Sequence, residues 1–157
     1  MKIEQIAQEA KRASILAAAM DTELKNNALR AVAKALEEKK ADIIAANEED
    51  LKRSEQENLA MPLLKRLKFD EPKINGVIDG INSLIELDDP VGKLQMGTEL
   101  DEGLELYKVS CPIGVIGVIF ESRPDALVQI ATLCLKSSNA VMLKGGSEAK
   151  KTNRILT

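Results

Sequence analysis

The sequence contains no histidine and no tryptophan, and it has only one tyrosine and two phenylalanines. Without histidine the chain has no imidazole for acid–base catalysis or for a metal site. An aromatic content of 2% leaves few rings on which nucleic-acid bases could stack. The net charge of −3 also argues against a nucleic acid as the main partner, because binding to phosphates generally needs a basic face.

Long apolar runs and a dense set of cysteines are missing as well. No stretch approaches the length of a membrane span, and the amino terminus lacks the apolar core of a signal peptide. We therefore expect a cytoplasmic chain with no membrane partner. The two cysteines, Cys111 and Cys134, do not form the framework of a secreted domain. What is present is an ordinary globular mixture of 45% apolar and 30% charged residues, over a length of 157 residues that is enough to bury one core.

Helical periodicity dominates the first 90 residues. Apolar residues recur at helical spacing and predict helices over 3–20, 24–36, 43–51, 62–67 and 74–85. Asp70 and Pro72 mark a new helix start, and Asp88-Asp89-Pro90 ends the last of these helices. The charged groups in this region, such as Glu48-Glu49-Asp50 and Lys52-Arg53, are interpreted as a solvated helix face.

After Pro90 the pattern changes from helix to strand. Two segments, 94–100 and 104–111, flank Asp101-Glu102-Gly103 and predict a β-hairpin. The continuous apolar run 114–120 is typical of a strand buried on both faces.

The rest of the chain predicts an α/β arrangement. A helix is expected from Pro124 to about Lys136, a second short buried strand over 140–143, and a last helix after Gly145-Gly146. Strand, helix, strand and helix in this order predict the beginning of a parallel sheet.

Three consecutive segments carry a specific resemblance. They are Cys111–Phe120 (CPIGVIGVIF), Glu121–Asp125 (ESRPD) and Leu133–Ala149 (LCLKSSNAVMLKGGSEA). Together they resemble the signature of the γ-glutamyl phosphate reductases, a branch of the aldehyde dehydrogenase superfamily. The segments Asn47–Asp50 and Asp88–Gly92 are similar to that family too.

The resemblance implies a fold and a division of the chain. The fold is α/β, with N-terminal helices, a β-hairpin and the start of a parallel Rossmann-like sheet of the aldehyde dehydrogenase fold. Residues 1–157 would form the N-terminal portion of the NADP-binding domain. Within it, 1–90 would be helical, 94–111 would be a hairpin of the oligomerisation sheet, and 112–157 would be a βαβ core.

The resemblance further implies an activity. The family reduces γ-glutamyl 5-phosphate to glutamate 5-semialdehyde with NADPH and releases phosphate, in proline biosynthesis. A cysteine thiolate attacks the acyl phosphate, and a thioester remains until hydride is delivered. The catalytic domain would be absent from this chain and the nucleophilic cysteine would lie beyond Thr157, so the chain alone is expected to be inactive. The full-length protein is expected to be a homo-oligomer.

Lys144 begins the candidate cofactor site, because it follows a strand and precedes Gly145-Gly146 at the sheet edge where open parallel sheets bind ligands. A lysine before a turn with free backbone N–H groups suits a ribose or a phosphate. The alternative is a solvated lysine after a strand. The resemblance implies that Lys144, Gly145, Gly146, Ser147 and Glu148 bind NADPH or NADP.

The loop after the first buried strand is the candidate substrate site. The resemblance implies that Glu121, Ser122 and Arg123 line it, and the Arg123 guanidinium could hold an acyl phosphate or a substrate carboxylate in a fork. The alternative for Arg123 is a capping or salt-bridged arginine at a helix start. Neither cysteine is expected to be the nucleophile. Cys111 lies at the start of a strand, at the sheet edge opposite the expected site, and Cys134 lies within an apolar helix.

Two other functions stay open on the sequence. One is a stand-alone, non-catalytic helical or nucleotide-binding module. The other is an ordinary aldehyde dehydrogenase acting on another substrate. The loop Glu121–Pro124 argues against the latter, because ordinary members carry a loop of Pro-Trp-Asn type there. No metal site is expected under any of these readings.

Overall fold

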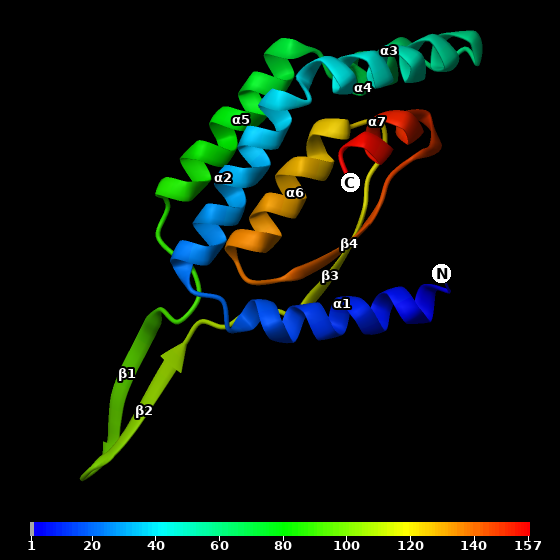
Figure 1. Ribbon diagram of the computed structural model, residues 1–157. Helices are drawn as coiled ribbons and strands as arrows, with labels where there is room; N and C mark the ends of the chain where they lie inside the picture. The colour runs from blue at the N-terminus through cyan, green and yellow to red at the C-terminus, as the bar shows by residue number, and fades with distance from the viewer. Residues whose placement is uncertain (1) are drawn as a thin grey trace.

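The computed structural model describes residues 2–157. Within them the helices are α1 (Ile3–Ala18), α2 (Thr22–Glu38), α3 (Lys40–Gln56), α4 (Met61–Leu67), α5 (Glu71–Glu86), α6 (Pro124–Lys136) and α7 (Lys150–Ile155), with a 3-10 turn η1 (Ser147–Ala149). The strands are β1 (Leu94–Asp101), β2 (Leu104–Val109), β3 (Val115–Ile119) and β4 (Ala140–Lys144). Helices α2, α5 and α6 lie side by side, with α3 and α4 across one end and α1 across the other (Figure 1).

Two helix starts show how local sequence sets these boundaries. Asp21 precedes α2, and its carboxylate accepts a 2.7 Å hydrogen bond from the Leu24 amide. Asp70 caps α5 in the same way, with Pro72 in the first turn where a missing N–H does no harm. These caps satisfy amides that have no partner inside the helix. Helix α5 therefore begins where Asp70 and Pro72 predicted, and α2 begins two residues before the predicted range 24–36.

One apolar core joins the helical layer. Its members come from α2, α3, α5, α6 and the segment between α4 and α5, and they are Leu29, Ala33, Leu36, Ile43, Phe69, Ile74, Val77, Ile81, Leu84, Leu127 and Val128. Burying a large apolar side chain of this kind contributes about 1.5–3 kcal/mol to folding. The core therefore holds α6, and with it the loop that begins α6, firmly against the helices.

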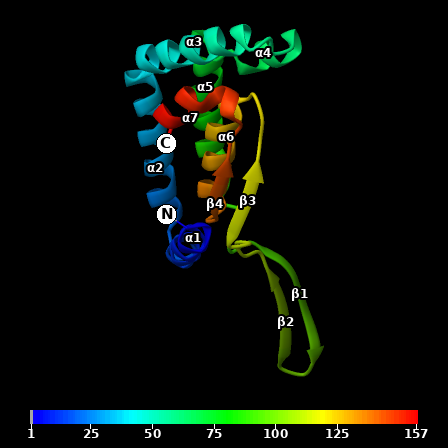
Figure 2. The same ribbon diagram turned by 90° about the vertical axis from the view of Figure 1, so that its right-hand side faces the viewer.

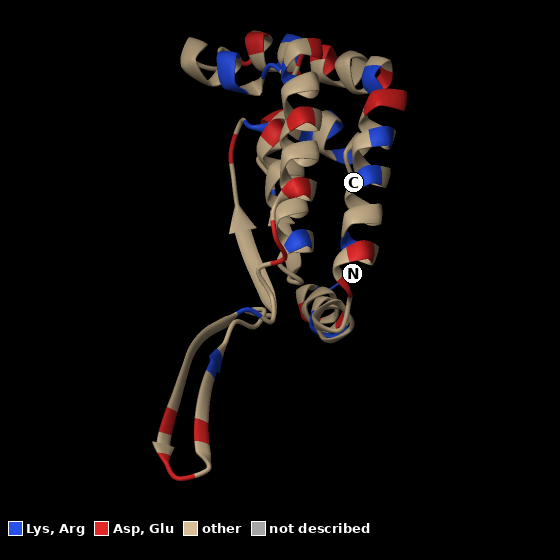
Figure 3. Cartoon of the chain, turned by 90° about the vertical axis from the view of Figure 1, so that its left-hand side faces the viewer, with Lys and Arg blue, Asp and Glu red and all other residues tan. Residues whose placement is uncertain are grey.

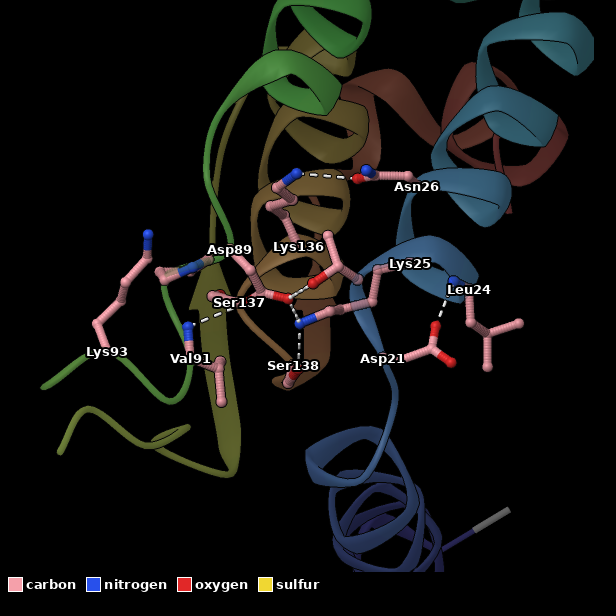
Figure 4. A network of polar contacts seen from close by, with 12 residues as sticks. Asp21, Leu24, Lys25, Asn26, Asp89, Val91, Lys93, Lys136, Ser137 and Ser138 are labelled. Atoms are coloured by element: carbon pink, nitrogen blue, oxygen red, sulfur yellow. Dashed lines mark hydrogen bonds and ion pairs between the residues drawn. The ribbon is translucent and has the colours of Figure 1, made fainter.

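A buried ion pair fastens the segment before the hairpin to the helices (Figure 4). Lys25 on α2 is 1% exposed, and its ammonium pairs with Asp89 and donates a 3.1 Å hydrogen bond to the Ser138 hydroxyl. Asp89 also accepts hydrogen bonds from the Thr22 hydroxyl at 2.7 Å and the Val91 amide at 3.0 Å. The pair thus joins the start of α2, the residues after α6 and the chain leading into β1.

The β1–β2 hairpin projects away from the rest of the molecule (Figures 1 and 2). Its strands are antiparallel, with Gly97 opposite Tyr107, and Gly103 takes the positive φ of 75° that the tight turn requires. Every residue of both strands is exposed. Acidic residues gather at its tip, whereas both signs of charge are mixed along the helices (Figure 3).

Strands β3 and β4 form a parallel pair whose register runs from Val115 beside Ala140 to Ile119 beside Lys144. The predicted burial of these strands on both faces is wrong for this chain. No residue of either strand is fully buried, and Ile119 is 77% exposed. The reason is that residues 2–157 give this sheet only two strands, which α6 and α1 cover in part.

Candidate functional site

Two loops meet at the carboxyl-terminal edge of the parallel pair. Residues Glu121–Arg123 follow β3, while Lys144 ends β4 and leads into the turn of Gly145 and Gly146. Ile119 and Lys144 are neighbours in the register, and the Phe120 amide donates a 3.1 Å hydrogen bond to the Lys144 carbonyl. The parallel pairing therefore brings the predicted cofactor residues and the predicted substrate loop to the same place.

A carboxylate from one loop holds the other. One oxygen of Glu148, Oε1, accepts hydrogen bonds from both the backbone amide and the hydroxyl of Ser122. Ser122 is buried and has a positive φ of 46°, a conformation that a non-glycine residue adopts at a cost. The contact with Glu148 stabilises this conformation, so the shape of the 121–123 loop depends on the turn after β4.

Glu148 is ionised at neutral pH. Its burial acts to raise the pKa of the carboxyl, but hydrogen bonds from its own backbone and from Ser122, together with the nearby Lys144 ammonium, bring the pKa below its usual value. Both hydrogen bonds from Ser122 go to Oε1, and no other residue within 2–157 donates to the second oxygen, Oε2. That oxygen can still accept a hydrogen bond from the hydroxyl of a ligand.

A side chain on either glycine after Lys144 would displace the end of a neighbouring side chain. A Cβ on Gly146 would lie 2.2 Å from both carboxylate oxygens of Glu148, and a Cβ on Gly145 would lie 2.3 Å from the Asn153 side-chain nitrogen. Such distances are far below van der Waals contact. Glycine therefore lets the turn fold back on Glu148 and leaves its backbone open to a ligand.

Side chains of helix α3 hold the turn after β4 in place. The sequence interpretation of these charged residues as a solvated helix face missed this role. Arg53 donates hydrogen bonds of 2.9 Å to the carbonyls of both Ser147 and Glu148. Asp50 is 0% exposed, pairs with Arg53 at 2.8 Å, and accepts hydrogen bonds of 2.7 and 2.9 Å from the amide and hydroxyl of Thr152. The sequence did contain a signal for this contact, because residues 43, 47, 50 and 54 recur at the spacing of one helix face and that face includes the apolar Ile43. All four residues are buried in the structure.

The remaining predicted residues are exposed at this edge. The Lys144 ammonium and the Ser147 hydroxyl are exposed and have no hydrogen-bond partner within the described chain, and Glu121 is exposed as well. Arg123 is exposed and forms an ion pair with Asp125 at 3.0 Å, so the alternative of a salt-bridged arginine at a helix start describes its geometry here. An exposed ammonium, a carboxylate oxygen, a hydroxyl and an open glycine turn are the groups that fit a ribose and its phosphates.

The two cysteines lie outside the two loops of this site. Cys111 is exposed, whereas Cys134 is buried in α6, where burial raises the pKa of its thiol. Among residues 2–157 no three His, Cys, Asp or Glu side chains are arranged to hold a metal ion. None of the helices within residues 2–157 combines the length and the apolar character of a membrane-spanning segment.

Comparison with known proteins gives relatives along the whole chain. No family model matches the sequence. A γ-glutamyl phosphate reductase from Acetivibrio thermocellus is 69% identical over 156 residues, which are 99% of this chain and 36% of that protein. The chain therefore spans about a third of the length of the curated relatives that it matches.

Solved structures give the same relationship. The crystal structure of γ-glutamyl phosphate reductase from Saccharomyces cerevisiae superimposes with a TM-score of 0.94 at 42% identity, over 97% of this chain and 39% of that one. A probable aldehyde dehydrogenase from Listeria monocytogenes matches with a TM-score of 0.70 at 15% identity, over 98% of this chain and 32% of that one, which shows the fold. The α/β arrangement predicted from the sequence is thus the aldehyde dehydrogenase fold. The chain corresponds to about one third of the length of its relatives, and it belongs to the γ-glutamyl phosphate reductase family.

Proposed function

We propose that this chain forms part of an NADPH-dependent reductase that converts γ-glutamyl 5-phosphate to glutamate 5-semialdehyde and releases phosphate, in cytoplasmic proline biosynthesis. The observation that carries the proposal is the meeting of the two loops at the end of the parallel strands, joined by the Glu148–Ser122 hydrogen bonds. The names of the relatives supply the reaction. A nucleophilic cysteine would come from chain beyond Thr157.

The cofactor would lie against the turn after β4. NADPH, when bound, supplies the hydride that reduces the acyl group. The Lys144 ammonium would donate to hydroxyl or phosphate oxygens of its adenosine half, and Oε2 of Glu148 would accept a hydrogen bond from a ribose hydroxyl, with Ser147 beside them. Gly145 and Gly146 would let that half approach the backbone closely. Arg53 would keep the turn in place by holding its carbonyls.

The substrate would lie along the 121–123 loop. Glu121, Ser122 and Arg123 lie one residue beyond the end of β3, so they would face a substrate held between the cofactor and the nucleophile. Arg123 keeps guanidinium donors beyond the one that pairs with Asp125, and these would bind an anionic group of the substrate. Because Glu148 holds the Ser122 amide, cofactor site and substrate loop would respond to each other.

The test is a titration of the 157-residue chain with NADPH, followed by amide chemical shifts. Shifts concentrated at 144–148 and 121–124 are expected, and Lys144→Ala should weaken binding about tenfold, as loss of a charged contact does. Lys150→Ala is the matched control, because Lys150 is an exposed lysine just beyond the turn with no polar partner in the described chain. Shifts confined to residues 2–87 would refute this placement.

A further inference from the structure

A charged groove lies beside the substrate loop, between α4, the start of α5 and the start of α6. It has a volume of about 530 Å³ and is lined by Lys65, Arg66, Lys73, Arg123 and Asp125. Four of these side chains are cationic and one is anionic, although the chain as a whole carries a net charge of −3. The groove is therefore a local concentration of positive charge with a single carboxylate in it.

One of the four cations maintains the groove's wall. The Lys73 ammonium donates hydrogen bonds to the carbonyls of Lys65 at 3.2 Å, Arg66 at 3.3 Å and Lys68. These carbonyls end α4 and carry the negative end of its dipole, so Lys73 neutralises them and fixes α4 against α5. With those carbonyls neutralised, the end of α4 does not repel an anion.

Two other cations are available for a ligand. Neither the Lys65 ammonium nor the Arg66 guanidinium has a hydrogen-bond or ion-pair partner within residues 2–157, and both come from the last turn of α4. Across the groove, Arg123 uses one nitrogen on Asp125 at 3.0 Å and keeps its other donors. An arginine on each wall offers the fork geometry that carboxylates prefer.

The Asp125 carboxylate in the groove determines whether a phosphate or an amino acid fits there better. The Asp125 side chain is 16% exposed and lies beside Arg123, so a phosphate bound to these cations would meet its negative charge at close range. An α-amino acid has a carboxylate and an ammonium on the same carbon, and it can place the first on the arginines and the second on Asp125. The charge pattern thus complements a zwitterion better than a phosphate.

We propose that this groove binds the α-carboxylate and α-ammonium of the substrate's amino-acid end, with Arg66, Arg123 and Lys65 on the carboxylate and Asp125 on the ammonium. The inference rests on the proposed function, which gives the substrate a glutamyl group. Arg123 directly follows Ser122, so a substrate anchored here would extend its acyl phosphate end toward the loop that Glu148 holds. The groove therefore orients the substrate and distinguishes an amino-acid derivative from a simple aldehyde or acyl phosphate.

The test compares three probes on the 157-residue chain by amide chemical shifts: L-glutamate, glutarate, which lacks the ammonium, and inorganic phosphate. L-glutamate is expected to shift residues 65–66 and 123–126 and to bind most tightly. Asp125→Asn should weaken L-glutamate about tenfold and leave glutarate unchanged or tighter, and Arg66→Gln should weaken both. Lys68→Gln is the matched control, because it removes one charge from the same end of α4 at a residue that pairs with Asp70 outside the groove.

Three outcomes would overturn the proposal: phosphate binding more tightly than L-glutamate, indifference of L-glutamate binding to Asp125→Asn, or no shift at the groove in a sample whose spectrum is folded. The NADPH titration of the same sample reports on the turn after β4 and is independent of these probes. A groove that fails while the turn binds NADPH refutes this inference alone. The reverse pattern refutes the cofactor placement.

Discussion

Replacing Asp89 with Asn should destabilise the chain far more than the same replacement one residue earlier. Asp89 faces Lys25, which is 1% exposed, whereas Asp88 pairs with Lys93 at the surface, where both side chains are more than half exposed. Asp89→Asn leaves the buried Lys25 ammonium without its counter-charge. Asp88→Asn removes only an exposed pair, so no measurable change in stability is expected from it.

The magnitude follows from two observations. Removing one partner of a buried pair typically costs 3–5 kcal/mol, and the 16% exposure of Asp89 places it at or below the lower end of that range. Independently, burial acts to raise the pKa of Asp89, but hydrogen bonds from Lys25, Thr22 and the Val91 amide outweigh it and lower the pKa from 3.8 to about 2. That shift corresponds to about 2.5 kcal/mol, so we expect Asp89→Asn to cost about 2–3 kcal/mol at pH 7.

The pH dependence of stability gives a separate check on the direction of the Asp89 pKa shift. The folded-state pKa of Asp89 lies below the unfolded value, so its stabilising contribution is complete above about pH 4 and is lost as the pH falls toward 2. The difference in stability between the unsubstituted chain and Asp89→Asn should therefore be constant from pH 7 to 5 and shrink below pH 4. Lys25→Met combined with Asp89→Asn should regain part of the loss, because no buried charge then remains.

The assay is urea unfolding followed by circular dichroism at pH 7, 5, 4 and 3. Asp89→Asn should lower the midpoint with little change in slope, and it should lower Tm by about 5–10 °C. Equal stabilities for Asp88→Asn and Asp89→Asn at pH 7 would show that the buried pair contributes nothing. A stability difference that grows as the pH falls would show that the sign is wrong.

Three other predictions concern single features of the structure. A thiol reagent should modify Cys111 at least about 100-fold faster than Cys134, because burial shields the latter and raises its pKa; equal rates in the folded chain would contradict the structure. Gly146→Ala should push the Glu148 carboxylate aside and reduce the exchange protection of the amide that it holds, and unchanged protection would mean that the turn tolerates a side chain. Leu106→Glu in the exposed hairpin should reduce the self-association measured by analytical ultracentrifugation, because open strand edges and exposed apolar side chains promote self-association. If the unsubstituted chain is already a monodisperse monomer, the oligomerisation role expected of the hairpin is refuted.

Local signals in the sequence predicted most of the elements well. The Asp70 cap with Pro72 placed the start of α5, and Asp101-Glu102-Gly103 placed the hairpin turn, because both depend on residues close together in the chain. The order of strands and helices predicted that Lys144 and the 121–123 loop would share one edge of the sheet, and the structure places them there.

Long-range polar contacts were not predictable in the same way. Lys25, Lys136 and Asp50 are charged residues that a sequence interpretation assigns to the surface, yet each is buried with partners far along the chain. Sequence spacing carries no information about which distant carbonyl a lysine will meet. The same limit hid the support that Arg53 gives to the turn and the basic groove beside Arg123.

The most direct test of the proposed function is the reverse reaction, catalysed by the polypeptide that contains this chain together with its catalytic cysteine. NADPH formation is measured from glutamate 5-semialdehyde, phosphate and NADP, with phosphate omitted in the control. The account predicts turnover that requires phosphate, and Lys144→Ala should raise the KM for NADP about tenfold. Oxidation that proceeds equally well without phosphate would identify an ordinary aldehyde dehydrogenase, and the absence of turnover in a folded protein would contradict the proposed reductase.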